Sequence, residues 1–365
     1  MKLLVHLARL FVAATFLFSG FVKLVDPLGS AYKFEEYFSA GVLNIEFLMP
    51  YALPFSILLI IAEIMLGVML LVGFKPKFTV YSLFVITLLF LFLTWYSAYY
   101  NKVTDCGCFG DAITLTPWET FYKNIILIVL IVFLLLKVDF IKPYLSETLT
   151  KWLTFLSLIV FLFISYYVLV HLPIVDFRAY AIGTDILQDM KTPEGAKKDV
   201  YEDTWIYEVN GEVQEFTTDE KPWELEGATF VDRKTKLIEK GYEPPIHDFT
   251  MEQGDQDRTE ELMQKDKLML VVMYNISKSD EQGLEQVSEI TTKASQEGYD
   301  VFGFSASPAS DFEALKKQYG FEFDQLFCDE TTLKTVIRAN PGIVLIHKGV
   351  IVGKYNANDA DAINF

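Results

Sequence analysis

Two cysteines separated by a single glycine are the residues of this chain best suited to chemistry. Cys106 and Cys108 lie in the stretch DCGCFGD, residues 105–111, between two long apolar segments. The pair could exchange electrons as a dithiol and a disulfide, supply two ligands to a metal ion, or brace a tight turn. A disulfide across one intervening residue closes a small, strained ring, and strained disulfides are more oxidising. The compartment that the loop faces decides between these interpretations.

The immediate surroundings of the pair restrict two of the interpretations. Structural zinc needs four ligands; His171 could add one, but no complete set is evident, so we expect no metal. A reactive thiolate needs electropositive surroundings, whereas Asp105 and Asp111 flank the cysteines. Redox chemistry therefore requires a nearby cation, for which the candidates are Lys23, Lys102 and Lys123.

Long apolar segments must position this loop. A membrane helix needs about 20 mostly apolar residues to cross roughly 30 Å of hydrocarbon. Five segments qualify, namely residues 3–25, 51–73, 78–100, 121–136 and 152–172. Arg9 interrupts the first, and no small-x-small cleavage site follows it, so we expect a retained span rather than a signal peptide.

Charge divides the chain into two unlike parts. Residues 1–172 hold 11 Lys and Arg against 10 Asp and Glu, and the remaining residues hold 20 against 38. An apolar membrane part is thus followed by an acidic soluble part. Nucleic acid is an unsuitable partner for the acidic part, because phosphates must be neutralised by Lys and Arg.

The distribution of Lys and Arg among the short loops predicts the orientation. Basic residues gather at the N-terminus, at 75–77 and at 137–151, so these segments should face the cytoplasm. The alternate loops and the acidic part then face outward. We expect a multi-pass protein of a bacterial inner membrane with its N-terminus in the cytoplasm and its C-terminal domain in the periplasm. Disulfides form and persist there.

Polar residues inside the spans are costly and therefore informative. Glu63 is the carboxylate deepest in a span, and could bind a substrate, shuttle a proton or pair with Arg9 or Lys23. We favour the pairing. Lys23 itself can reach the interface from the end of the first span, where Pro27 stops the helix. The candidate polar residues of the bundle are Lys23, Asp26, Glu63 and Asn124.

Three stretches together resemble the DoxX superfamily, and within it the MauE-like branch. They are RLFVAATFLFSGFVKLVDP, AEIMLGVMLLVG, and DCGCFGD followed by Pro117 and YKNIILIVL, and the resemblance spans about residues 5–137. It implies a four-helix membrane bundle and a role in maturation of, or disulfide formation in, a periplasmic partner protein. The thiosulfate:quinone branch of DoxX suggests an alternative, a quinone-linked oxidoreductase subunit with a pocket near Glu63. No cofactor is otherwise indicated.

The soluble part begins with a small β-rich spacer. DTWIYEVNGEVQEF alternates around Asn210-Gly211, which predicts a two-residue hairpin. ATFVDRKTKLI is interpreted as a second short hairpin. We divide the chain into a four-helix membrane domain at 1–140, a fifth transmembrane helix at 150–173, this spacer at 174–240, and an α/β domain at 241–365.

Buried strands alternate with helices from about residue 241 and close on a hairpin at Lys348-Gly349. This order predicts an α/β sandwich. Together with PPIHDFTM and ANPGIVLIHKGVIVG it resembles the peroxiredoxin and TlpA-like branch of the thioredoxin superfamily. The resemblance implies a cis-proline at Pro341, on a surface that could dock a partner.

This domain departs from the thioredoxin pattern at the position of the redox cysteines. YNISKSDEQG, residues 274–283, follows the first long buried strand and contains no cysteine. Cys328 follows a later strand and is interpreted as a small core residue. We therefore expect the domain to be silent in thiol exchange and to serve as a docking platform.

These observations predict thiol–disulfide exchange, or electron delivery, to a periplasmic protein through Cys106 and Cys108. If the chain is an enzyme, it would be a membrane-bound thiol–disulfide oxidoreductase. The alternative from another class is a membrane-anchored adaptor or chaperone-like binding protein whose cysteines only brace the loop. The oligomeric state and the identity of the partner cannot be predicted from the sequence.

Overall fold

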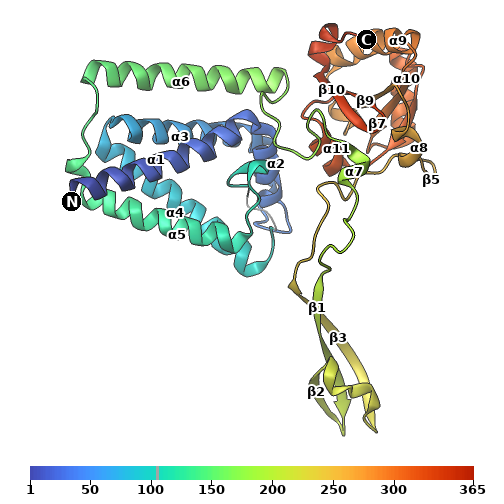
Figure 1. Ribbon diagram of the computed structural model, residues 1–365, viewed down its shortest axis with the longest axis horizontal. Coiled ribbons are helices and arrows are strands. Elements are labelled where there is room, and N and C mark those ends of the chain that lie inside the picture. Colours follow the sequence, from blue (N-terminus) through green and yellow to red (C-terminus); the bar gives the residue numbers. More distant parts are fainter. Residues whose placement is uncertain (104–106) are drawn as a thin grey trace. The chain divides into compact units, whose positions relative to one another are not determined.

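A computed structural model describes residues 1–103 and 107–365 of the chain. The described residues form two compact units. One combines Met1–Gly183 with Thr250–Phe365, and the other is Thr184–Phe249. The larger unit contains a helix bundle and a C-terminal α/β region, and the smaller contains a β-sheet (Figure 1).

Five helices of the described chain are long and apolar enough to cross a membrane. Their bounds are α1 (Lys2–Val25), α3 (Ala52–Val72), α4 (Pro76–Tyr100), α5 (Pro117–Leu136) and α6 (Glu147–Val170). A short 3-10 turn, η1 (Glu46–Tyr51), extends α3 at its N-terminus. These helices coincide with the five predicted segments to within about five residues, so each predicted segment is confirmed as a helix long and apolar enough to span a membrane.

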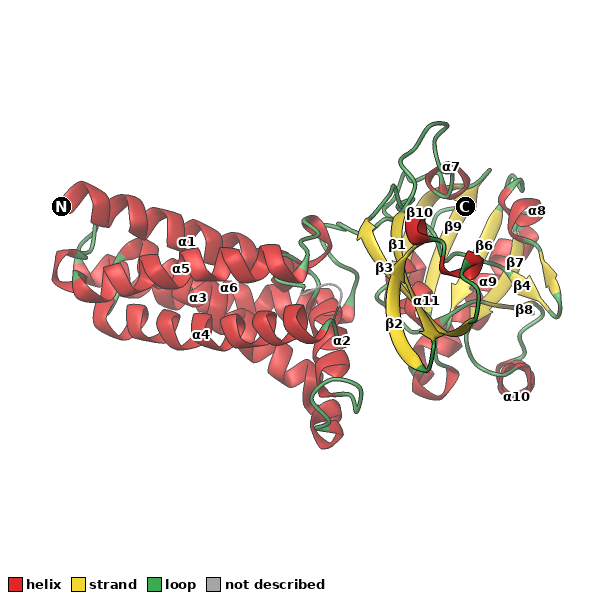
Figure 2. Ribbon diagram, turned by 90° about the horizontal axis from the view of Figure 1, so that it is seen from below, coloured by secondary structure: helices red, strands yellow, loops and turns green. Residues whose placement is uncertain are grey.

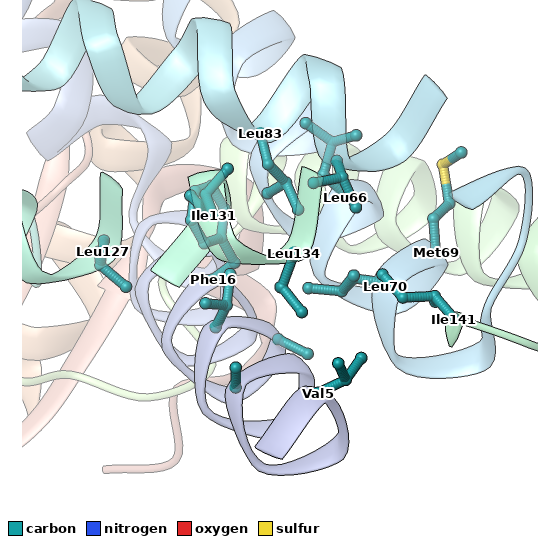
Figure 3. Packing of buried hydrophobic residues seen from close by; sticks show 14 residues of the cluster. Val5, Phe16, Leu66, Met69, Leu70, Leu83, Leu127, Ile131, Leu134 and Ile141 are labelled. Atoms are coloured by element: carbon teal, nitrogen blue, oxygen red, sulfur yellow. The ribbon is translucent and has the colours of Figure 1, made fainter. Parts of the chain in front are cut away.

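Close helix packing builds the bundle (Figure 2). α1 packs on α3 and α5, α4 packs on α5, and α6 lies against α3 and α1. Small residues let α1 and α3 approach, because a Cβ at Gly20 would lie 2.7 Å from the Ile64 Cβ and one at Gly67 would lie 3.0 Å from the Leu17 Cγ. A fully apolar core, which includes Leu70, Ile131 and Leu134, fills one end of the bundle (Figure 3).

Arg9 stabilises the end of α3 rather than pairing with a carboxylate. Its side chain is completely buried. The guanidinium donates from Nε to the Leu70 carbonyl at 2.8 Å, from one NH₂ to the Leu71 carbonyl at 3.0 Å and from the other to the Lys142 carbonyl at 2.9 Å. The last carbonyls of a helix lack partners within it, so this arginine supplies donors to two carbonyls at the end of α3 and links them to the segment after α5.

The segment after α1 contains a helix that was not predicted from the sequence. Pro27 ends α1 as expected, but it also occupies the first position of α2 (Pro27–Phe38). Asp26 caps that helix by accepting a hydrogen bond from the Gly29 amide at 3.0 Å. Proline is favourable at this position, since its missing N–H would be unsatisfied there anyway. The proline therefore marks a corner between two helices and not the start of a loop.

The C-terminal region is a seven-stranded sheet flanked by helices. Its strands lie in the order β10-β9-β6-β7-β8-β4-β5, with β6, β7 and β8 parallel and β9 antiparallel to β6. All residues of β6 are buried, as expected for a central strand. The strand bounds are β4 (Glu252–Gln253), β5 (Gln256–Asp257), β6 (Leu268–Val272), β7 (Asp300–Ser305), β8 (Asp324–Phe327), β9 (Gly342–His347) and β10 (Val350–Asn356).

Helices connect these strands in the predicted α/β order. The main helices are α9 (Glu281–Gln296), α10 (Ala309–Tyr319) and α11 (Glu330–Val336), with the shorter α8 (Thr259–Met263) before β6. The Asn340–Pro341 peptide bond, directly before β9, is cis. β9 and β10 form the predicted hairpin, with positive φ at Lys348 (46°) and Gly349 (81°).

The smaller unit contains a three-stranded sheet in the order β2-β1-β3, preceded by the short helix α7 (Ile186–Asp189). β1 (Val200–Val209) and β2 (Glu212–Thr217) form the predicted hairpin, with φ of 54° at Asn210 and 85° at Gly211. The second predicted hairpin is wrong, because β3 (Ala228–Glu239) is one continuous strand paired with β1. This segment lacks a residue pair suited to the positive φ of a tight turn. It pairs instead with β1 along the full length of that strand.

Candidate functional site

The loop that carries the two cysteines is anchored on the first helix of the bundle. Cys106 lies outside the described residues, and Cys108 is half-buried. The Ser19 hydroxyl on α1 donates a 2.6 Å hydrogen bond to the Cys108 carbonyl. We call the described residues 107–111 the Cys loop. Its position is therefore fixed by a polar contact with the bundle interior.

Two glycines allow the Cys loop to lie this close. Gly107 and Gly110 have φ of 61° and 50°, a region that is unfavourable for residues with a side chain. A Cβ at Gly110 would also lie 2.9 Å from the Val22 Cγ1. Phe109 lies between them, with its ring 5.4 Å from that of Phe18 and 4.3 Å from the Lys123 ammonium. The loop thus packs on α1 and α5 through an aromatic contact and a cation–π contact.

A buried ion pair lies close to the loop. The Lys23 ammonium on α1 donates to both carboxylate oxygens of Glu63 on α3, at 3.0 and 2.9 Å, and to the Ser19 hydroxyl at 2.6 Å. The predicted pairing of Glu63 is confirmed, with Lys23 as its partner. The expectation that Lys23 extends to the membrane surface is wrong, since its side chain is only 10% exposed. An unpaired Glu63 carboxylate inside the bundle would be strongly destabilising, so Lys23 pairs with it instead of placing its ammonium in water.

Cys108 borders two small cavities within the bundle. One, of about 10 Å³, also has Glu63, Thr87 and Asn124 in its wall. The Thr87 hydroxyl is buried without a hydrogen-bond partner among the described residues, and the Asn124 amide donates to the Thr94 hydroxyl on α4 at 3.3 Å. The other cavity, of about 70 Å³, lies beside Lys23 and is mostly apolar. The first cavity is about the size of one water molecule, and the few polar atoms in its wall belong to the charged and hydroxyl side chains named here.

The surroundings of Cys108 supply some of the cations that a thiolate requires. Lys23 and Lys123 border the same small cavity as Cys108. The Lys23 charge is balanced by Glu63, so Lys123 on α5 is the more effective of the two. Thr87 and Ser19 are site residues that the sequence analysis missed, because hydroxyls are common in membrane helices and neither belongs to a recognisable motif.

Asp26 pairs with a residue that is remote in the sequence. Arg338, between α11 and Pro341, donates from Nε to both Asp26 carboxylate oxygens at 3.0 and 2.9 Å. Its guanidinium also lies 3.7 Å from the Asp111 carboxylate in the Cys loop. Burial would lower the pKa of Arg338, but the charges of Asp26 and Asp111 outweigh it and the pKa is raised. No local signal in the sequence could have revealed a contact between residues 312 positions apart.

Aromatic side chains complete this corner. The Tyr32 hydroxyl on α2 donates to that of Tyr274 at 3.3 Å, and the Arg338 guanidinium lies 5.3 Å from the Tyr32 ring. Burial, with the neighbouring Tyr274 hydroxyl, raises the pKa of Tyr32 well above its usual value. Tyr32 therefore stays a neutral hydrogen-bonding group at every accessible pH.

The remaining predicted site residues lie inside the C-terminal region. Pro341 is buried, and a Cβ at Gly283 on α9 would lie 3.1 Å from its ring. A partner that docks at this corner would therefore contact its neighbours, such as the half-buried Asn340. Cys328 is completely buried, in agreement with its interpretation as a core residue. His171, considered above as a metal ligand, instead lies 2.6 Å from the Asp359 carboxylate.

Metal-ligating side chains do not cluster in the described residues. Among residues 1–103 and 107–365, no group of three or more His, Cys, Asp or Glu side chains is placed to hold a metal ion. The site that can be described is therefore made of Cys108, hydroxyls, paired charges and small cavities.

Comparison with known families agrees with the bundle. Residues 1–137 match the family of methylamine utilisation protein MauE. Residues 201–240, which include β2, β3 and all but the first residue of β1, match a domain of unknown function, DUF8463. No curated protein matches the chain. The match to MauE covers the first four membrane-spanning helices and the Cys loop, so the chain is a multi-pass membrane protein whose N-terminal part is MauE-like.

Proposed function

We propose that this protein carries out thiol–disulfide exchange at the outer surface of a bacterial inner membrane, with Cys106 and Cys108 as the reacting pair. The observation that carries the proposal is the placement of Cys108. It is half-buried, its carbonyl is held by Ser19, and it borders a small cavity whose wall also includes Lys123 and the Lys23–Glu63 pair. A loop that only braced the bundle would not need a thiol beside buried charges.

The exchange is balanced in atoms and electrons without a further reagent. A thiolate of the partner protein attacks one sulfur of the Cys106–Cys108 disulfide, and the other sulfur leaves as a thiolate. The partner's second thiol then displaces the remaining sulfur from the mixed disulfide. The partner loses two electrons and two protons, and the Cys106–Cys108 pair gains them; the reverse sequence reduces a partner disulfide.

The orientation of the protein supports this chemistry. Lys and Arg gather on the loops that alternate with the Cys loop, which favours a cytoplasmic N-terminus and a periplasmic Cys loop. The periplasm is an oxidising compartment where thiol–disulfide exchange operates. The partner is accordingly a periplasmic protein, and the bilayer is the other permanent contact.

The C-terminal region serves as a thioredoxin-like platform in this proposal. The parallel β6–α9–β7 unit, the antiparallel β9–β10 hairpin and the cis-proline before β9 support that fold. Lys278, Ser279 and Asp280 occupy the position of the usual redox cysteines, so the platform relies on the membrane thiols. In this proposal four segments contribute to one function. They are the bundle at 1–140, the helix at 150–173, the spacer at 174–240 and this region.

Trapping of a mixed disulfide tests the proposal. In Cys108→Ala, Cys106 lacks the thiol that would resolve an intermediate, and a partner should remain covalently attached in membranes prepared after acid quenching. Cys106→Ala is the reciprocal trap, and Cys328→Ala is the matched control because Cys328 is completely buried. Adducts in either trap that disappear on reduction support exchange.

The absence of adducts in both traps, together with full activity of the Cys106→Ser/Cys108→Ser variant in complementing a deletion strain, would contradict the proposal. That result would instead favour a membrane-anchored adaptor, for which the C-terminal region without redox thiols is suited. The structure offers less support for a quinone-linked subunit. The cavity beside Lys23 measures about 70 Å³, whereas small-molecule sites usually exceed about 300 Å³.

A further inference from the structure

The Cys loop forms part of the wall of a larger polar cleft. The cleft has a volume of about 580 Å³. Its lining includes Gly107, Gly110 and Asp111 of the loop, together with Arg178 and Arg338. The loop therefore shares this cleft with charged residues that are remote from it in the sequence.

Arg338 contacts two acidic residues that line this cleft. Its bidentate pair with Asp26 fixes the corner between α1 and α2, and its guanidinium lies 3.7 Å from Asp111. The arginine side chain is 7% exposed, compared with 18% for Asp26 and 44% for Asp111. A planar guanidinium held bidentately is a rigid link, so its position is set by the corner and not by the more exposed Asp111.

This contact changes the charge that Cys108 experiences. The acidic flank of the loop would raise the energy of a thiolate if it were unpaired. The Arg338 charge is shared between Asp26, its closer partner, and Asp111, three residues from Cys108, so it offsets part of the Asp111 charge. Charged residues line the three cavities that border the described loop. They are Lys23 on α1, Asp26 between α1 and α2, Lys33, Glu35 and Glu36 on α2, Glu63 on α3, Asp111 within the loop, Lys123 on α5, Asp176 and Arg178 after α6, Lys334 on α11 and Arg338 before β9.

We propose that Arg338 is a positioning residue of the thiol site, which holds the Cys loop against the α1–α2 corner and neutralises its acidic flank. The C-terminal region is then an integral part of the site as well as a platform for partners. The inference rests on the proposed function for its purpose, but the charge effect on Cys108 can be measured without it.

The test is the rate at which iodoacetamide alkylates Cys108 as a function of pH. The full-length chain carries Cys106→Ser, so that Cys108 has no disulfide partner, and its peptide is quantified by mass spectrometry. In Arg338→Gln, the rate at pH 7 should fall about threefold to tenfold, as expected when a compensating charge near a thiolate is removed in partly hydrated surroundings.

Arg178→Gln is the matched control. Arg178 is similarly buried and lines the same cleft, and its substitution removes the same charge, but it pairs with Asp176 and the Thr335 carbonyl. Its substitution should leave the profile of Cys108 unchanged. Adding Asp111→Asn to Arg338→Gln should restore the alkylation rate of Cys108. Arg338→Lys keeps the positive charge and should retain most of that rate, so it tests the proposal even if Arg338→Gln folds poorly.

The proposal would be overturned if the alkylation rate of Cys108 were the same with Arg338→Gln as with arginine at this position. It would also be overturned if Arg338→Gln and Arg178→Gln lowered that rate equally. A failure of Asp111→Asn to restore the rate would overturn it as well. Alkylation requires only a thiolate, so these outcomes are independent of mixed-disulfide trapping. Trapping without an effect of Arg338 would refute the positioning role alone, and the opposite result would refute only the exchange function.

Discussion

Removing one charge from the buried Lys23–Glu63 pair should destabilise the helix bundle more than removing both. The two side chains are 10% and 3% exposed, and Nζ lies 2.9 Å from the nearer carboxylate oxygen. At an effective dielectric constant of about 20, charges at this separation attract by about 6 kcal/mol. Much of that attraction is offset by the cost of taking both ions out of water.

The variants should therefore separate clearly in a double-mutant cycle. Lys23→Met and Glu63→Gln each leave an uncompensated buried charge, which should lower the free energy of unfolding by about 3–5 kcal/mol. The double variant leaves no charge and should lose about 2 kcal/mol or less, because replacing a buried ion pair by neutral side chains is often close to neutral. The coupling energy should then be at least about 4 kcal/mol.

Reversible unfolding of the full-length protein in mixed micelles by SDS, followed by circular dichroism at 222 nm, provides the measurement. The exposed Lys151–Glu147 pair on α6, with side chains 65% and 85% exposed, is the matched control, and its single variants should change stability by less than about 0.5 kcal/mol. Losses that simply add in the Lys23→Met/Glu63→Gln variant would rule out the expected coupling, as would single variants as stable as the unsubstituted chain.

Three further predictions concern the scaffold. Arg9→Met should lower the unfolding free energy in the same assay by about 2–4 kcal/mol, because one buried and two partly buried carbonyls lose their donor; Arg9→Lys should recover only part of it. Gly211→Val should destabilise the β1–β2 hairpin by about 1–2 kcal/mol, because φ is 85° there, which hydrogen exchange of the hairpin amides would reveal. Burial and the Arg178 charge, opposed by Asp176, lower the pKa of Lys354 to about 8. Between pH 8 and about 10.4 the unfolded chain then binds a proton that the folded chain does not, so the unfolding free energy of the C-terminal region should rise across that window by up to about 3 kcal/mol; Lys354→Met should abolish the rise.

Features encoded in contiguous residues could be predicted from the sequence. Five apolar runs predicted five membrane-spanning helices, and Asn210-Gly211 predicted a hairpin with positive φ at both residues. Apolar length and turn residues act locally, so one sequence suffices to interpret them. The strand and helix order of the C-terminal region was predicted for the same reason.

Features that depend on interactions between distant residues could not be predicted in full. Pro27 was interpreted as a stop because its role as the first residue of α2 depends on capping by Asp26. The pairing of Glu63 was expected, but the choice between Arg9 and Lys23 depends on how α1 lies on α3. Arg338 had no signal at all, because its partners lie in another part of the chain.

The proposed function requires Cys106 and Cys108 to form a reversible redox pair, which a redox titration measures. Full-length protein carrying Cys328→Ala would be equilibrated in thiol–disulfide buffers of defined potential, quenched with acid and labelled with a maleimide that adds a resolvable mass for each thiol. We expect a single two-electron transition between zero and two labels at a potential between about −270 and −120 mV, the range of thiol–disulfide catalysts. Two labels at every potential, or none even under strong reduction, would contradict the redox function.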